Sequence, residues 1–281
     1  MNFAVIGGDE RSVYLVCRLL QDGHEVATWG MECASGVQET KHAHLEEALE
    51  GAECVVLPVP LSVKAGMLNA PFGETETKLD QVLSRLPAGV PVFAGAVSPG
   101  IQALCETWGV KVTDLLAMEE LAVKNAALTA EGAIGVLIRE TDRCLMGRDI
   151  LIVGAGRIGK LLGMRLKALG ANVTVSARKE SDKAWCRGMC LGTVDTGELE
   201  LVLPRFSVVI NTVPSLVLPG DRLRCLPRGA FLLELASKPG GIDQQAAQSQ
   251  GHRVVTALGL PGKTAPKSAA AAIVDTIYHN I

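Results

Sequence analysis

The hydrophobic and polar positions of this chain follow the same pattern twice. An apolar run that leads into a glycine begins at Val5-Ile6-Gly7 and returns at Ile152-Val153-Gly154, an offset of 147 residues. After each glycine, apolar residues recur at helical intervals. They are Val13, Val16, Leu19 and Leu20 in the first copy, and Leu161, Leu162, Leu166 and Leu169 in the second. Gly23 and Gly170 then stand where a helix commonly ends. Each copy therefore predicts a strand, a turn, a helix and a second strand.

Further short apolar runs continue both copies. We expect strands at Cys54–Leu57, Pro91–Ala94 and Val110–Thr113, and at Val208–Asn211, Ala230–Glu234 and Arg253–Thr256. Helical stretches separate these runs, which is typical of a mostly parallel sheet. Residues 118–145 contain no proline and predict one long helix between the two halves, which Gly132 could interrupt. The predicted fold class is α/β, with two Rossmann-like parallel-sheet domains joined by a long helix and a cleft between them.

Composition restricts the class of protein further. A chain of 281 residues that is 48% hydrophobic and 20% charged can bury a substantial core. Its net charge is -3, and no basic stripe carries interleaved aromatic residues, which argues against a nucleic-acid surface. We find no signal peptide and no apolar run of bilayer-spanning length, so we expect a cytoplasmic protein without a membrane partner. The eight cysteines are mostly scattered in apolar surroundings and predict free thiols and no metal site.

The second copy carries the pattern of a dinucleotide turn. Its residues are Gly154, Ala155, Gly156, Arg157, Ile158 and Gly159, directly after a strand and at the start of a helix. In this pattern the first glycine permits the tight turn, the second leaves room for a pyrophosphate, and the third lets helix and strand pack closely. The helix N-terminus offers free N–H groups to the anion. This motif, in this context, predicts a dinucleotide site.

The first copy lacks the same motif. Gly7, Asp9 and Ser12 occupy the matching positions, and Asp9 would place a carboxylate where the pyrophosphate should lie. We therefore expect residues 1–120 to form an N-terminal substrate or partner domain. Residues 121–146 are the expected connecting helix, and residues 147–262 the expected NAD(P)-binding domain. Residues 263–281 form the expected C-terminal helix, which returns to the N-terminal domain.

The end of the second strand in this domain bears on the choice of cofactor. An acidic residue there would accept hydrogen bonds from the ribose 2′-hydroxyl of NAD, and none is present. Ser176, Arg178 and Lys179 could instead bind a 2′-phosphate. We favour NADP over NAD, although the two cations could also be ordinary solvated surface charges. After the third strand, Thr212, Val213 and Pro214 either wall the nicotinamide side or form an ordinary turn.

Charged residues on the connecting helix are the candidates for catalysis. Lys124 lies one helical turn after Glu120, and Glu131 lies close to three turns after Glu120. If this face lines a cleft, Lys124 and Glu131 could supply a cation and a proton acceptor. The alternative is a face of solvated charges, or a simple salt bridge to Lys124. The five histidines form no recognisable triad.

A glycine- and proline-rich loop at residues 259–267 carries Lys263 and Lys267, which could bind carboxylates. Pro266 suits a first helical position, so the loop could also be a helix cap alone.

Several motifs in this order make the chain similar to the A subunit of dipicolinate synthase from spore-forming bacteria, over nearly its whole length. They are Gly7-Gly8-Asp9-Glu10-Arg11, Asn125, Thr129-Ala130-Glu131-Gly132-Ala133-Ile134, the Gly154–Gly159 turn, Asn211-Thr212-Val213-Pro214, Glu234-Leu235-Ala236-Ser237-Lys238-Pro239-Gly240-Gly241 and Gly259-Leu260-Pro261-Gly262-Lys263-Thr264-Ala265-Pro266-Lys267. Wider relatives are the two-domain 2-hydroxyacid and alanine dehydrogenases. Glu234 stands where we expect Asp in many relatives.

The resemblance implies oxidation of dihydrodipicolinate to dipicolinate during sporulation, in a branch of the lysine and diaminopimelate pathway, together with the flavoprotein-like B subunit of dipicolinate synthase. We expect NADP as cofactor, Glu131 and Lys124 as catalytic candidates, and a homo-oligomer. The substrate-binding candidates are Arg11, Asn125, Thr129, Lys263 and Lys267. Two alternatives remain open: another NAD(P)-dependent hydroxyacid or amino-acid dehydrogenase, and a non-catalytic NADP-binding component of the synthase.

Overall fold

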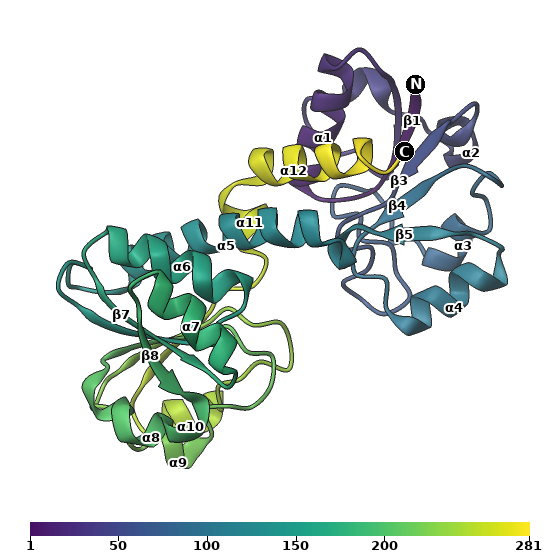
Figure 1. Ribbon diagram of the computed structural model, residues 1–281. Coiled ribbons are helices and arrows are strands. Elements are labelled where there is room, and N and C mark those ends of the chain that lie inside the picture. The colour runs from purple at the N-terminus through teal and green to yellow at the C-terminus, as the bar shows by residue number, and fades with distance from the viewer. The chain divides into compact units, whose positions relative to one another are not determined.

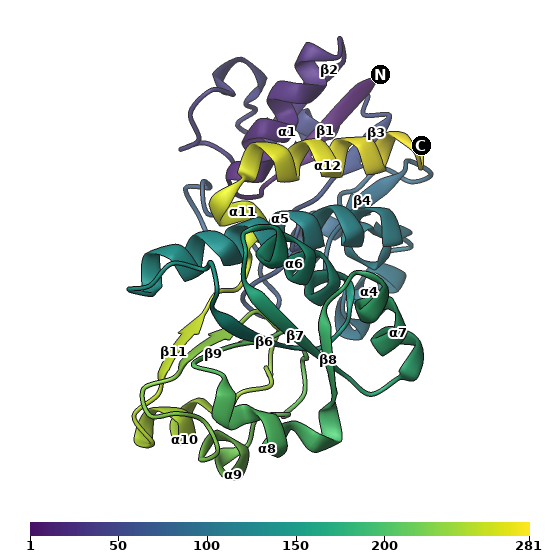
Figure 2. The same cartoon turned by 60° about the vertical axis from the view of Figure 1, so that its left-hand side comes forward.

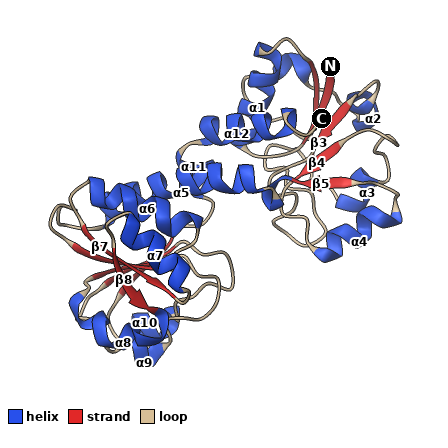
Figure 3. Cartoon of the chain, viewed as in Figure 1, coloured by secondary structure: helices blue, strands red, loops and turns tan.

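The computed structural model describes all 281 residues, which form two compact units. Unit 1 consists of Met1–Asn125 and Pro261–Ile281, and unit 2 of Ala126–Leu260. Each unit contains one parallel sheet with helices on both of its faces (Figures 1 and 3). The α/β class with two Rossmann-like parallel sheets is thus confirmed.

Unit 1 has a five-stranded sheet with the order β2-β1-β3-β4-β5. Its strands are β1 (Asn2–Ile6), β2 (Glu25–Trp29), β3 (Cys54–Val56), β4 (Val92–Ala94) and β5 (Val112–Asp114). One face packs against α1 (Glu10–Gln21) and α12 (Pro266–Tyr278), which lie side by side in Figures 1 and 2. The other face is covered by α2 (Leu45–Leu49), α3 (Leu79–Leu83) and α4 (Pro99–Thr107). The order of strands reverses between β1 and β3, which is where such sheets bind ligands.

Unit 2 has a six-stranded sheet with the order β11-β10-β9-β6-β7-β8. Its strands are β6 (Asp149–Val153), β7 (Asn172–Ala177), β8 (Gly192–Asp195), β9 (Val208–Asn211), β10 (Phe231–Glu234) and β11 (Arg253–Thr256). One core lies between the sheet and α5 (Glu119–Glu140), α6 (Arg157–Ala168) and α7 (Glu180–Gly188). The core on the other face includes α8 (Leu199–Val202), α9 (Gly220–Leu223) and α10 (Gln244–Ser249). Here the order reverses between β6 and β9.

The repeat predicted from the hydrophobic pattern is present in the two sheets. Strand β1 and helix α1 have the same lengths as β6 and α6, and their bounds differ by the offset of 147 residues seen in the sequence. The continuous burial of β6, from Ile150 to Val153, explains why apolar runs located most of the strands.

Two strands differ from the expected ones by more than one residue at their start. Strand β8 was not predicted, because it lies at the sheet edge, begins with a glycine and is only half-buried, so it shows no apolar run. Strand β5 begins at Val112 and not at Val110, because the Val110 N–H still closes α4 with a hydrogen bond to the Cys105 carbonyl at 2.9 Å.

Helix α5 corresponds to the predicted long helix but ends at Glu140 and not at residue 145, and α11 (Leu260–Thr264) precedes α12. By length and composition alone α5 could span a membrane, with a mean hydropathy of 1.4. Our expectation that no apolar run is long enough is therefore wrong. Ala130, Ala133 and Leu137 of α5 are nevertheless buried in the core of unit 2, which is typical of a core helix in a soluble protein.

Candidate functional site

A pocket of about 660 Å³ lies in unit 2 at the carboxyl ends of β6, β7 and β9. This is the point where the strand order reverses. The pocket is lined by Gly154, Ala155, Gly156, Arg157, Lys160, Ser176, Ala177, Arg178, Lys179, Asp182, Thr196, Thr212, Val213, Pro214, Ser215, Leu216 and Val217. Most of the residues that the sequence predicted for the cofactor are among them.

The glycines of the turn differ in what surrounds them. Gly154 has φ +105°, and a Cβ there would lie 2.5 Å from Thr212 Oγ1. A Cβ on Gly159 would lie 1.9 Å from the Gly154 carbonyl oxygen. The turn and the helix can therefore lie this close together only because residue 159 has no side chain. At Gly156 nothing lies within 4 Å of an added Cβ. Gly156 is also the N-cap of α6, and no side chain caps this helix. The space and the uncapped helix start fit a pyrophosphate.

The corresponding turn in unit 1 is closed. Asp9 is the N-cap of α1, and its carboxylate accepts a hydrogen bond from the Arg11 N–H at 3.0 Å. The Gly8 N–H donates to the Asn69 carbonyl at 2.8 Å, and a Cβ on Gly7 would lie 3.0 Å from Leu68 Cδ2. The chain thus fills this turn with its own carboxylate and its own loop.

The end of β7 provides the cations of the pocket. Arg178 and Lys179 are exposed, and neither forms an ion pair. Ser176 is fully buried, and Thr196 Oγ1 lies 3.4 Å from its hydroxyl oxygen. Unpaired cations beside a pocket can bind an anion without first losing a partner.

Thr212, Val213 and Pro214 are held by a buried polar network. The Asn211 side chain contacts both the N–H and the carbonyl of Val213, at 3.1 and 2.9 Å, and donates to Glu234 Oε1 at 2.7 Å. Glu234 is only 2% exposed. Its carboxylate accepts three more hydrogen bonds, from the N–H groups of Ala236, Gly241 and Ile242. Glu234 therefore fixes two loops at the carboxyl edge of the sheet.

Two predicted cofactor residues do not line the pocket. Ile158 packs against the core of unit 2, and Gly159 is buried against the turn. The sequence analysis also missed lining residues, among them Lys160, Asp182 and Thr196. Thr196 follows the unpredicted strand β8. Lys160 lies in the first turns of α6, and its distance along the chain from Asp182 hid their contact.

Lys124 does not sit in this pocket. Its ammonium donates to Glu120 Oε1 at 2.7 Å and to Asp275 Oδ2 at 3.3 Å, and His279 Nδ1 lies 3.1 Å from Glu120. Burial lowers the pKa of Lys124, but the hydrogen bonds with Glu120 and Asp275 outweigh it and raise the pKa above its ordinary value. Lys124 is therefore a cation at neutral pH and not a base.

Glu131 is exposed and lies 3.5 Å from Arg165 Nη2 of α6, and it does not line the pocket. Thr129 is buried, and both Thr129 and Asn125 are engaged in polar interactions. The structure thus brings none of these three predicted residues to the wall of the pocket.

The remaining substrate candidates belong to unit 1. The Arg11 guanidinium pairs with the Asp9 carboxylate through two hydrogen bonds, of 2.9 and 2.6 Å, and packs against Gly262 of α11. Lys263 and Lys267 are exposed and form no ion pair. Arg11 is thus already neutralised by Asp9, whereas the two lysines are available to an anion.

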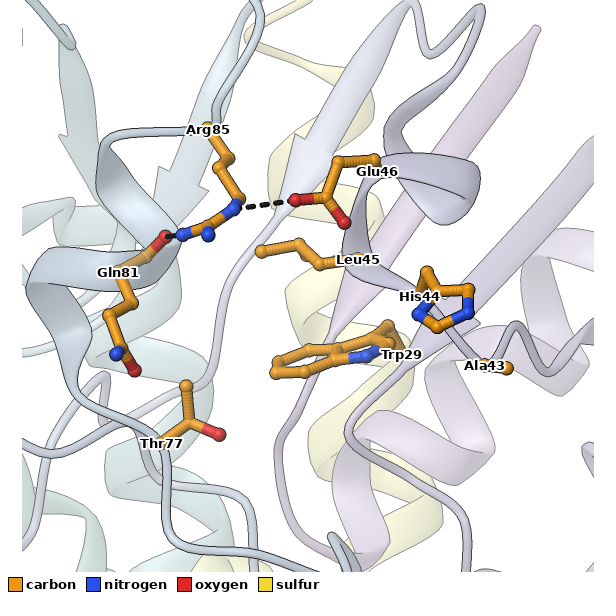
Figure 4. Close-up of a pocket in the computed structure, with 8 residues that line it drawn as sticks. All are labelled: Trp29, Ala43, His44, Leu45, Glu46, Thr77, Gln81 and Arg85. Atoms are coloured by element: carbon orange, nitrogen blue, oxygen red, sulfur yellow. Dashed lines mark hydrogen bonds and ion pairs between the residues drawn. The ribbon is translucent and has the colours of Figure 1, made fainter.

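Unit 1 has a second pocket, of about 270 Å³, on the face that α2 and α3 cover (Figure 4). Trp29 lies in its middle, and Arg85 Nε donates to Glu46 Oε1 at 2.6 Å along one side. His44, Thr77 and Gln81 complete much of the wall. None of the residues predicted for cofactor or substrate lines this pocket.

The strand orders and the open glycine turn define the class of protein, a two-domain Rossmann-like fold of the dehydrogenase type. A transhydrogenase structure from Sinorhizobium meliloti shares this fold, with a TM-score of 0.72 and 17% identity, over 98% of this chain and 93% of that one. The chain belongs to the family of dipicolinate synthase A subunits. It is 30% identical to the dipicolinate synthase A subunit of Bacillus subtilis (strain 168), over 96% of this chain and 92% of the relative.

Two further comparisons agree with this family. Residues 2–116 match the model of the N-terminal domain of the dipicolinate synthase A subunit. The crystal structure of the dipicolinate synthase A subunit from Bacillus halodurans has a TM-score of 0.92 and 27% identity, over 99% of this chain and 97% of that one.

Proposed function

We propose that this chain is the NADP-dependent A subunit of a dipicolinate synthase, which oxidises dihydrodipicolinate to dipicolinate together with the B subunit of that synthase. The observation that carries the proposal is the pocket of unit 2, where an open glycine turn lies beside two unpaired cations. Membership of the family supports the substrate class. We further propose a cytoplasmic location and a homo-oligomeric assembly.

For the cofactor, Gly154, Gly156 and the first turn of α6 would hold the pyrophosphate. Arg178 and Lys179 would hold the 2′-phosphate, with Ser176 nearby, and Thr212–Pro214 would wall the nicotinamide side. Bound NADP⁺ would supply a hydride acceptor. The fit rests on this chain's own geometry, because the space in front of Gly156 is open and the helix start is uncapped.

For the substrate, aromatisation of a dihydropyridine removes one hydride and one proton. We propose Lys263 and Lys267 for the carboxylates, since they have no partner, with Arg11, Asn125 and Thr129 as further candidates. Glu131 remains our candidate for the proton acceptor, because its carboxylate is exposed. Lys124 would contribute positive charge only, since its pKa is raised.

NADP is expected to raise the thermal unfolding temperature of the purified chain more than NAD does. Exchange of Arg178 and Lys179 for alanine should weaken NADP binding about 10- to 100-fold and change NAD binding little, because charge-assisted contacts to the 2′-phosphate are lost. Thermal shifts and calorimetric titration measure both. Arg228→Ala, an exposed arginine outside the pocket, is the matched control. A larger shift with NAD would contradict the NADP assignment.

Dipicolinate formation from dihydrodipicolinate and NADP is expected, measured with and without the B subunit. Product with this chain alone would eliminate the non-catalytic alternative. The assay with the B subunit is needed because Lys124 and Glu131 are both ion-paired and neither lines the pocket. Product only with the partner would favour a cofactor-binding role for this chain. Failure to form product under either condition would contradict the proposed activity.

A further inference from the structure

A lysine and an aspartate that line the unit 2 pocket form an ion pair. Lys160 Nζ lies 2.8 Å from Asp182 Oδ1, and both residues line the pocket. Their side chains are 28% and 33% exposed, so the pair is neither fully buried nor free in solvent. The sequence motifs did not single out either residue.

The ion pair links α6 to α7, the helices that follow β6 and β7. In a doubly wound sheet these are the helices beside the adenosine half of a bound dinucleotide. Lys160 lies in the first turns of α6, and side chains on a helix lean toward its N-terminus, so its ammonium reaches back toward the pocket. Asp182 lies in the first turn of α7, four residues after Arg178. Both charges therefore lie beside the end of β7, where a site of this kind binds the 2′-hydroxyl of the ribose.

The charged residues that line the pocket differ in whether they form an ion pair. Arg178 and Lys179 have no ion pair, whereas Lys160 is held by Asp182. Asp182 is also the only carboxylate among the residues that line the pocket. A carboxylate at this place has two effects on the binding of a 2′-phosphate, because it repels the phosphate and it holds Lys160 in an ion pair.

We propose that Lys160 is a third cation for the 2′-phosphate and that Asp182, by holding Lys160, limits the preference of this site for NADP over NAD. The inference rests on the proposed function, since it assumes that a dinucleotide binds in this pocket. Asp182 acts through Lys160 and is a specificity-determining residue of the cofactor site. NAD, which has a hydroxyl in place of the phosphate, avoids this repulsion.

Asp182→Asn is expected to tighten NADP binding about tenfold and to leave NAD binding within about twofold, since only the phosphate feels the removed charge. Lys160→Gln should weaken NADP binding about tenfold. Calorimetric titration of the full-length chain with NADP, NAD and adenosine 2′,5′-bisphosphate gives the dissociation constants directly. Asparagine keeps an oxygen that Lys160 can contact, so the local geometry is retained.

Glu180→Gln is the matched control. It removes one negative charge from the same turn of α7, but Glu180 pairs with Lys183 and Arg187 and does not line the pocket. An equal gain from Glu180→Gln would overturn the inference, because the effect would then be a general change of charge. An unchanged ratio of NADP to NAD affinity in both Asp182→Asn and Lys160→Gln would also overturn it. Wild-type chain that binds neither dinucleotide would instead refute the proposed function itself.

Discussion

Replacement of Gly156 by aspartate is expected to lower dinucleotide affinity at least about 100-fold while the fold stays intact. Unit 1 already has this arrangement, because Asp9 is the N-cap of α1 as Gly156 is the N-cap of α6. An aspartate at Gly156 would likewise cap α6, since an added Cβ meets nothing within 4 Å. Its carboxylate would then take the N–H groups and the space that a pyrophosphate needs, and it would repel the phosphates.

The two readouts of Gly156→Asp should move in opposite directions. Aspartate is a somewhat better N-cap than glycine, by a few tenths of a kcal/mol, so the unfolding temperature without ligand should hold or rise slightly. The thermal shift with NADP should disappear. Gly156→Ala adds volume without charge and is the control that separates bulk from repulsion. Unimpaired NADP binding by Gly156→Asp would mean that the pyrophosphate lies elsewhere.

Glu234→Gln is expected to destabilise unit 2 by about 2–4 kcal/mol, although the two side chains have nearly the same shape. Each oxygen of Glu234 accepts two hydrogen bonds, Oε1 from Asn211 and Ala236, and Oε2 from Gly241 and Ile242. Whichever way a glutamine amide turns, its NH₂ group would face two donors. At least two buried groups would then lose their acceptor.

Urea or thermal unfolding measures this effect, as a shift of the transition assigned to unit 2. Glu198→Gln removes a carboxylate from an exposed position of the same unit and should change stability by less than about 0.5 kcal/mol. NADP binding to Glu234→Gln should weaken as well, because Glu234 holds Asn211 and, through it, Val213 at the pocket wall. A variant as stable as wild type would show that the loops do not depend on this carboxylate.

Most of the fold was predictable because buried parallel strands are continuous apolar runs. Strands β9 and β11 have the predicted bounds, and α12 (Pro266–Tyr278) lies within residues 263–281, where the sequence predicts a C-terminal helix. Strand β8 was not predictable in this way, since an edge strand that is half exposed needs no apolar run. Its omission also concealed Thr196, which lines the pocket only because β8 carries the chain back to the carboxyl edge.

The residues of the candidate site also differ in how well the sequence predicts them. A glycine turn is predictable because the backbone itself demands the residue, as the clash at Gly159 demonstrates. Charged side chains have no such signature. The spacing of Glu120 and Lys124 correctly allowed a salt bridge, but the second partner, Asp275, lies 151 residues away in the chain. Glu131 similarly meets Arg165 only after α5 and α6 pack together.

The Asp9 carboxylate caps α1 in unit 1, so the start of this helix needs no ligand. A helix start that carries its own carboxylate is as stable in a cell without the dinucleotide as in one that has plenty. If a dinucleotide binds at the uncapped start of α6, as proposed, the stability of unit 2 rises with the concentration of that ligand. Under the proposed function, the lifetime of unit 2 against unfolding and proteolysis would therefore report how much dinucleotide is present, whereas the start of α1 would not respond to it.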